Sequence, residues 1–437
     1  MLAFEDVGSG RSMEVYYKNL IDSGKIIPII AYTNRSSYTR APAWVKNKIL
    51  SEITIIDHAE KDCDRTTCHK AYHRTNSDWF NDCKYYVMLL RKIFGEKVLW
   101  VVDMPFPEIE QYMGRYIIQV FHGELFNIGV SYFDRPRSES FKNYALIFAH
   151  GQLMKDKLIY GCHLDQNDPR IKMIGRVLDD SLYSGKIIRS DVLRSYGLDP
   201  KKRTVLFSPS WEAKKLWAIG EKEDDFNNLR EFCLYTKKTG LNLILRPHTI
   251  LIAHHNVRTI CEKVSRQFSH VYFDDSTKYN IDGPNKNLIA ADIMITDLSS
   301  IASDFLSLGK PVIFLYPAKK YRESGQWGSG LPTYRQVAAV SYTVKDFKSM
   351  YNRISKLLLS EESAQIIKRR KDFSAHIFAH SNGSSGYLFC KELENFSGSL
   401  EVKDFLNNNY LLNLLKYISA STYRKHLKNI EFNVTFA

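Results

Sequence analysis

The feature that constrains this chain most is a succession of strand, polar turn, helix and strand in residues 290–317, AADIMITDLSSIASDFLSLGKPVIFLYP. Residues 292–296 form a short apolar run of β-forming side chains, and residues 312–316 form a second one. Between them, apolar side chains recur at helical spacing until Gly309 ends the helix. The pattern predicts a βαβ-type unit, which is the building block of an open α/β sheet.

The polar turn of this unit is the first candidate site. It contains Asp297, Ser299 and Ser300, which are side chains that cap helices. The turn follows the carboxyl end of a strand, where open α/β sheets bind ligands, and the first amides of a helix favour anions. The turn therefore suits a phosphate group, although an ordinary helix cap with no ligand fits the same residues.

Strands and helices alternate along the whole chain, and 437 residues are too many for one ordinary core. In the first half the predicted strands are residues 2–4, 25–32, 97–103, 116–121, 145–149 and 171–175. In the second half they are residues 204–208, 241–246, 270–274, 292–296 and 311–316, with helices at 225–239, 257–268 and 300–308. We expect an α/β protein with two doubly wound domains that face each other.

The predicted domain boundaries follow from this alternation. An N-terminal Rossmann-like domain spans residues 1–185, a connector spans 186–203, and a C-terminal Rossmann-like domain spans 204–390. Residues 391–437 form a helical tail, for which packing on the N-terminal domain and lying on an anionic membrane surface both remain open.

Two further polar loops follow strands of the second domain. Ser208 and Ser210 follow one strand, and Arg246 and His248 follow the next in the sequence RPH. Arginine can hold a phosphate through two donors, and histidine can donate a hydrogen bond to it. Because these loops share a sheet edge with the turn at Ser299, we expect a ligand that carries phosphate.

In the first domain, a predicted strand ends directly in His122 and a glycine. A histidine at the carboxyl end of a strand often projects into a catalytic site, although the position alone favours a packed or surface histidine. Cysteines and histidines in residues 57–84 match no firm zinc template, and we expect no metal.

The formal net charge of +13 calls for an anionic partner. No nucleic-acid-binding signature is present, so an anionic membrane face or a polyanionic substrate is the expected partner. No apolar run reaches the length of about 20 residues that spans a bilayer, and the first residues lack a signal-peptide pattern. The seven scattered cysteines fit reduced thiols. We expect a cytoplasmic protein, with peripheral attachment to the inner face of the cell membrane.

Taken in order, the motifs resemble those of the CDP-glycerol and CDP-ribitol polyol-phosphotransferases of bacterial teichoic acid and capsule synthesis. The resemblance implies a GT-B fold, in which two Rossmann-like domains face each other across a cleft. The matching segments are residues 119–123, 175–180, 206–211, 245–248, 295–300 with Asp304, 309–312 and 383–385.

The resemblance also implies roles for individual residues. His122 and His248 are the implied catalytic residues, the first as general base and the second at the donor pyrophosphate. Asp304 is expected to face the polyol. The implied donor-binding residues are Arg246, Ser208, Ser210, Asp297, Ser299, Ser300, Asp304, Gly383 and Ser384. The family's usual lysine after the histidine and glycine is missing, because residues 124–127 read ELFN.

The implied reaction transfers glycerol phosphate or ribitol phosphate from a CDP-polyol to a hydroxyl, with release of CMP. The acceptor is a glycan or a polyol phosphate, which in this pathway can be linked to lipid, and no cofactor or metal is expected. Two alternatives remain: a GT-B glycosyltransferase that uses a nucleotide-sugar, and a non-catalytic protein that binds nucleotides or polyanions.

Overall fold

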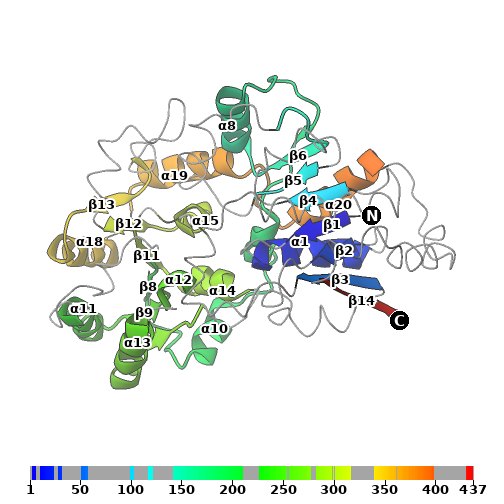
Figure 1. Cartoon of the computed structure of the whole chain (residues 1–437). Helices are drawn as coiled ribbons and strands as arrows, with labels where there is room; N and C mark the ends of the chain where they lie inside the picture. Colours follow the sequence, from blue (N-terminus) through cyan, green and yellow to red (C-terminus); the bar gives the residue numbers. More distant parts are fainter. Residues whose placement is uncertain are drawn as a thin grey trace.

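A computed structural model of the chain shows two lobes, each built on one parallel sheet (Figure 1). The structure describes residues 2–5, 10–23, 28–31, 51–57, 99–102, 117–121, 141–209, 226–252, 255–276, 282–297, 299, 301–315, 339–360, 362–397 and 430–436. His122, Ser210 and Ser300 lie outside these ranges, as do the cysteines and histidines of residues 57–84 that follow residue 57.

The second lobe contains a six-stranded sheet in the order β10-β9-β8-β11-β12-β13, and every neighbouring pair is parallel. Counted from β8, this order is 3-2-1-4-5-6, which is the dinucleotide-binding arrangement of doubly wound folds. The strands are β8 (Thr204–Phe207), β9 (Asn242–Leu245), β10 (Val271–Phe273), β11 (Ile293–Thr296), β12 (Val312–Leu315) and β13 (Tyr342–Val344). The five predicted strands are confirmed. The sixth strand, β13, is not among the predicted ones.

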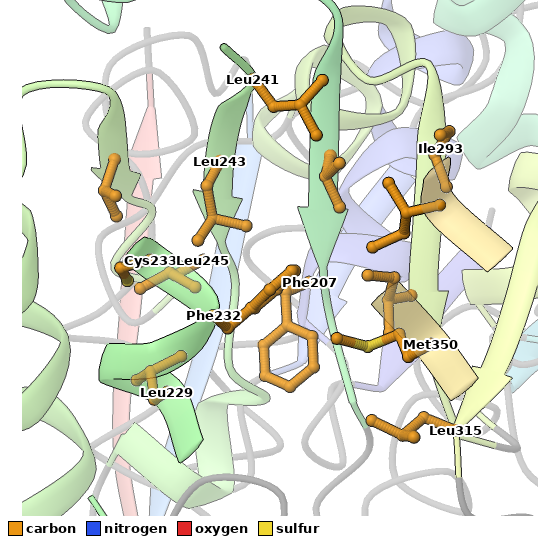
Figure 2. Close-up of a cluster of buried hydrophobic side chains, with 14 of the residues drawn as sticks. Phe207, Leu229, Phe232, Cys233, Leu241, Leu243, Leu245, Ile293, Leu315 and Met350 are labelled. Atoms are coloured by element: carbon orange, nitrogen blue, oxygen red, sulfur yellow. The ribbon is translucent and has the colours of Figure 1, made fainter. Parts of the chain in front are cut away.

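Helices cover both faces of this sheet, which explains why its inner strands are continuous apolar runs. On one face, Phe207 of β8 packs among Phe232 and Met350 from two helices (Figure 2). The helices of this lobe are α11 (Phe226–Lys238), α12 (Thr249–Ile252), α13 (His255–Gln267), α14 (Gly283–Ala290), α15 (Ile301–Ser307), α18 (Phe347–Leu359) and α19 (Ala364–Ile377). The three predicted helices are confirmed to within two residues at each end.

The first lobe also has six parallel strands, in the order β2-β1-β4-β5-β6-β7. They are β1 (Leu2–Glu5), β2 (Pro28–Ala31), β4 (Leu99–Val102), β5 (Ile117–Gln119), β6 (Leu146–Ala149) and β7 (Ile171–Met173). Helices α1 (Gly10–Ser23) and α8 (Gln152–Cys162) belong to this lobe. All six predicted strands are present.

A separate antiparallel pair joins β3 (Ser51–Asp57) to β14 (Ile430–Phe436). The end of the predicted tail is therefore a strand that pairs with the amino-terminal part of the chain. The sequence predicts a helical tail over residues 391–437. Within it, residues 391–397 are helical and belong to α20 (Ser385–Ser397), residues 430–436 form β14 instead of a helix, and residues 398–429 lie outside the described residues.

Between the lobes, the chain passes through a 3-10 helix, η4 (Val177–Asp179), then α9 (Asp180–Tyr183) and α10 (Arg189–Ser195). It returns to the first lobe through α20 (Ser385–Ser397), where Phe389 packs against Tyr16 of α1 with ring centroids 4.7 Å apart. This return helix contains the predicted boundary at residue 390.

Candidate functional site

The middle of the second sheet, where β8 and β11 lie side by side, is the point at which the strand order reverses. Ser208 follows β8 and its amide donates to the carbonyl of Ile295 at 2.9 Å. The buried hydroxyl of Thr296 donates back to the carbonyl of Ser208 at 2.7 Å. These two bonds hold the ends of both strands in register. The carboxyl edge at such a switch point is where doubly wound sheets bind ligands.

The predicted phosphate turn leaves β11 at this edge. The amide of Ser299 donates to the carbonyl of Asp297 at 2.8 Å, and the carbonyl of Ser299 accepts the amide of Ala302 at 3.1 Å. Ser299 is half-buried and lies directly before α15. The structure thus brings Ser208, Asp297 and Ser299 to one sheet edge, as the sequence predicts.

Arg246 follows β9 at the same edge, and its amide donates to the carbonyl of Phe207 at 2.9 Å. Its guanidinium forms an ion pair with Asp274, which follows β10. Asp274 also accepts a hydrogen bond from the amide of Asn287 at 2.5 Å, and Asn287 accepts one from the hydroxyl of Tyr196 at 2.8 Å. The predicted phosphate-binding arginine is therefore held by a protein carboxylate. Sequence analysis missed Asp274, whose only signal is its place directly after a strand.

His248 lies two residues beyond Arg246 and directly before α12, and its carbonyl accepts the amides of Leu251 and Ile252 in that helix. Loss of surrounding water, and then the nearby Arg246 charge, lower the pKa of its imidazole from 6.5 to about 4. His248 nevertheless keeps an exposed surface, so solvent weakens this effect on its pKa. A neutral imidazole at pH 7 can donate one hydrogen bond and accept another.

Asp304 does not lie on an open surface that would face a substrate polyol. It is buried in the first turn of α15, and its carboxylate oxygen lies 2.5 Å from Nη1 of Arg176. Arg176 also lies 3.4 Å from Asp179, so three charged side chains meet between the lobes. Sequence analysis did not predict Arg176, because no local pattern indicates a partner 128 positions away.

Gly383 and Ser384 lie where the chain returns to the first lobe. Gly383 has φ +80°, which favours glycine, and an added Cβ would lie 3.2 Å from the carbonyl oxygen of Asp180. The Ser384 hydroxyl donates to the side chain of Asn382 at 2.6 Å.

The carboxylate of Asp180 occupies the start of α20. It accepts the amides of Ser385 and Gly386 at 3.0 and 2.7 Å. Burial raises the pKa of the Asp180 carboxyl, and these two amide bonds oppose the rise. A protein carboxylate thus takes the place at this helix start where a ligand anion would bind.

The described part of the chain offers neither a metal-binding cluster nor a membrane-spanning helix. Within it, no group of three or more His, Cys, Asp or Glu side chains has an arrangement that would hold a metal ion. None of the described helices combines the length and the apolar composition that a membrane span needs.

Comparison with solved structures identifies the fold. The wall teichoic acid polymerase TagF is similar over 92% of this chain and 90% of its own, with 15% identity and a TM-score of 0.58. A UDP complex of MnaA from S. aureus matches over 91% of this chain and 97% of its own, with 13% identity and a TM-score of 0.56. The UDP-GlcNAc 2-epimerase of Neisseria meningitidis, solved with UDP-GlcNAc, matches over 90% of this chain and 99% of its own, with 13% identity and a TM-score of 0.56.

No curated protein sequence matches the chain. The shared architecture nonetheless defines a GT-B protein, with two Rossmann-like lobes, as predicted. The model of the family CDP-glycerol:poly(glycerophosphate) glycerophosphotransferase matches residues 99–392. The chain belongs to this family and is an enzyme of the glycerophosphotransferase type, which confirms the resemblance drawn from its motifs.

Proposed function

We propose that this enzyme transfers glycerol phosphate from CDP-glycerol to a hydroxyl of a polyol-phosphate or glycan acceptor in teichoic acid synthesis and releases CMP. The observation that carries the proposal is the family match over residues 99–392, because that range contains both the switch-point edge and His122. TagF, which shares the fold, is a wall teichoic acid polymerase.

The donor side of the proposal uses the carboxyl edge of the second sheet. Amides at the start of α15 and the hydroxyl of Ser299 face the diphosphate in this proposal, and Ser208 follows the neighbouring strand. Ser210 and Ser300 are expected from their places in the sequence to add hydroxyls. Arg246 supplies positive charge and His248 a neutral donor. Because the held guanidinium and the fixed amides need no rearrangement, they stabilise charge that develops on the leaving CMP.

The acceptor side of the proposal uses His122, which follows β5 of the first lobe. The acceptor hydroxyl oxygen forms a bond to the glycerol-linked phosphorus, while the bond from that phosphorus to the bridging oxygen breaks. The hydroxyl proton passes to the His122 imidazole, and the electron pair leaves with CMP. A histidine suits this step because its ordinary pKa lies near neutrality.

Ribitol phosphate as the transferred group, and a lipid-linked acceptor at the cytoplasmic membrane face, extend the same proposal. The net charge of +13 supports an anionic partner surface. Capsule polymers are a second class of product that the same chemistry would make.

A donor screen tests the proposal. The full chain is incubated with CDP-glycerol, CDP-ribitol and UDP-GlcNAc, each with a glycerol-phosphate oligomer as acceptor, and the released nucleotide is identified by chromatography. We expect CMP from CDP-glycerol. Release of a nucleoside diphosphate from UDP-GlcNAc instead would identify a glycosyltransferase, and no turnover with any donor would favour a binding protein.

Two histidine variants separate the proposed roles. His122→Ala should abolish CMP release and leave the calorimetric Kd for CDP-glycerol largely unchanged. His248→Ala should weaken donor binding, because it removes a contact to the diphosphate. An equal loss of donor affinity in His122→Ala would contradict its assignment as the base.

A further inference from the structure

A buried ion pair crosses from the first lobe to the second. Arg176 follows β7 of the first sheet, and Asp304 lies in the first turn of α15 in the second lobe. Their closest atoms are 2.5 Å apart, and each side chain is 10% exposed. Removing two charges from water costs several kcal/mol per ion unless each has a well-placed partner. The contact is therefore specific to one arrangement of the two lobes.

The segment that carries Arg176 is fixed to the first lobe. Val177 belongs to the core cluster of that lobe, together with Tyr16 and Phe389. Two residues before Arg176, the amide of Ile174 donates to the carbonyl of Ala149 at the end of β6, at 3.1 Å. The segment that carries Arg176 is thus attached to the first lobe.

The same segment is also bound by the second lobe. The side-chain amide of Asn285 in α14 donates to the carbonyl of Leu178 at 2.7 Å and to the hydroxyl of Ser181 at 2.6 Å. The hydroxyls of Tyr183 and Ser307, the latter in α15, lie 2.5 Å apart. Helix α15 is therefore held to this junction by two residues three positions apart, Asp304 and Ser307.

The position of α15 sets the position of the phosphate turn. Ser299 lies directly before this helix, and its carbonyl accepts the amide of Ala302 in the first helical turn. Asp304 lies in the same first turn. A shift of α15 relative to the first lobe would therefore carry Ser299 with it.

We propose that Arg176 and Asp304, here called the interlobe pair, are positioning residues that fix the phosphate turn relative to the first lobe and its acceptor base. The inference rests on the proposed function and deepens it. It assigns Asp304 to the alignment of donor and acceptor sides and not to contact with the polyol. An offset of about 1 Å between reacting groups can cost roughly a hundredfold in rate.

The test compares two ion pairs. Arg176→Met and Asp304→Asn break the interlobe pair, and Arg189→Met serves as the matched control. Arg189 lies 2.8 Å from Asp292, at the opposite, amino-terminal end of β11. Each full-length variant is assayed for kcat with CDP-glycerol, for the calorimetric Kd of CDP-glycerol, and for Tm.

We expect kcat to fall about tenfold to a hundredfold in both interlobe variants, with the Kd within about threefold of the wild type, because the second lobe alone holds the donor. The double variant should fall no further than either single one, because the two residues act as a unit. Arg189→Met should keep its kcat. A rise in Kd that matches the fall in kcat would overturn the proposal, since it would indicate direct donor contact.

Hydrogen exchange supplies a readout that does not depend on the substrate. Amides of α15 should exchange faster in Arg176→Met than in the wild type, and not in Arg189→Met. If the wild type itself fails to bind CDP-glycerol, the proposed function fails, while unchanged exchange in α15 would refute the interlobe pair separately. Arg176→Lys, which keeps the charge but loses the planar fork, replaces Arg176→Met if the latter does not fold.

Discussion

The two lobes have similar sheets, but the carboxyl end of β6 in the first lobe differs from the switch-point edge of the second. At the end of β6, backbone of the segment around Ile377 packs directly against the chain. His150 is buried there, and its carbonyl accepts the amide of Ala379 at 2.8 Å. At Gly151, an added Cβ would lie only 2.2 Å from the carbonyl oxygen of Ile377.

In the second lobe, the corresponding strand ends carry polar side chains that other side chains hold in place. Thr296 fixes the carbonyl of Ser208, and Asp274 holds Arg246. The first arrangement makes a contact between lobes, and the second presents groups that suit a ligand. Strand ends at the same edge of two similar sheets can therefore differ, with one packed against the other lobe and the other carrying polar groups.

The largest effect is expected at the end of β6. Gly151→Ala should lower the free energy of unfolding by about 3 kcal/mol, because backbone atoms of α19 would have to move away from the new methyl group. Urea unfolding measures this loss. Gly185→Ala is the control: it has no atom within 4 Å of the added Cβ and should cost only about 1 kcal/mol from its positive φ.

Donor affinity of the folded Gly151→Ala protein should stay near the wild-type value. If Gly151→Ala instead lost donor affinity and kept its stability, the end of β6 would not differ from the switch-point edge in the way described.

The next effect is expected at Asp274. Asp274→Asn should weaken CDP-glycerol binding about tenfold, or about 1.4 kcal/mol, because Arg246 loses the partner that orients it. Calorimetry measures this change. The neighbouring Asp275→Asn, which breaks an ion pair with Arg258, should leave the affinity unchanged. Tighter binding by Asp274→Asn would instead indicate that this carboxylate competes with the diphosphate for Arg246.

A smaller effect is expected at the switch point. Thr296→Val keeps the shape of the side chain but removes the hydrogen bond to Ser208, at a cost of about 1 kcal/mol in stability. Donor affinity should fall along with stability. The buried Thr236→Val on α11 removes hydroxyl contacts of the same kind and should lower Tm without any change in donor Kd. Equal donor affinities in the two variants would contradict a role for the switch point.

The smallest effect concerns pH. The pKa of His248 is lowered in the folded protein, so the unfolded chain binds more protons between pH 6.5 and about 4. Acidification through this window should therefore destabilise the wild type more than His248→Gln, and the exposed surface of the ring limits the difference. Melting curves at pH 7.5 and 5.0 test this, and equal losses of Tm in the two proteins would contradict it.

Local patterns predict much of this fold. Short apolar runs indicate β8, β9, β11 and β12, and capping residues indicate the start of α15. Each of these signals lies within a few neighbouring positions. They also place Ser208, Arg246 and Ser299 at one sheet edge, because the ends of parallel strands meet there. By contrast, β13 has only three residues, and Thr343 in it is exposed, so its pattern is weak.

Partners far apart in the chain could not be predicted. Asp180 caps a helix 205 positions later, and Arg176 pairs with a residue 128 positions later. A carboxylate in the sequence does not indicate which cation or helix start it will meet, because tertiary packing decides that. For this reason Asp304 resembles a substrate ligand in the sequence and yet lies at a contact between lobes. The roles of the predicted site residues, including His122, Ser210 and Ser300, stay predictions.

The return of α20 to the first lobe has a consequence for biosynthesis. Phe389 and Leu393 complete a cluster whose other members include Tyr16 and Val101. During translation, α20 is made nearly four hundred residues after the amino-terminal part of this cluster. The cluster cannot be completed before then. The second sheet, whose strands are contiguous in sequence, can fold on the nascent chain first. The first lobe is therefore translated first but completes its fold last.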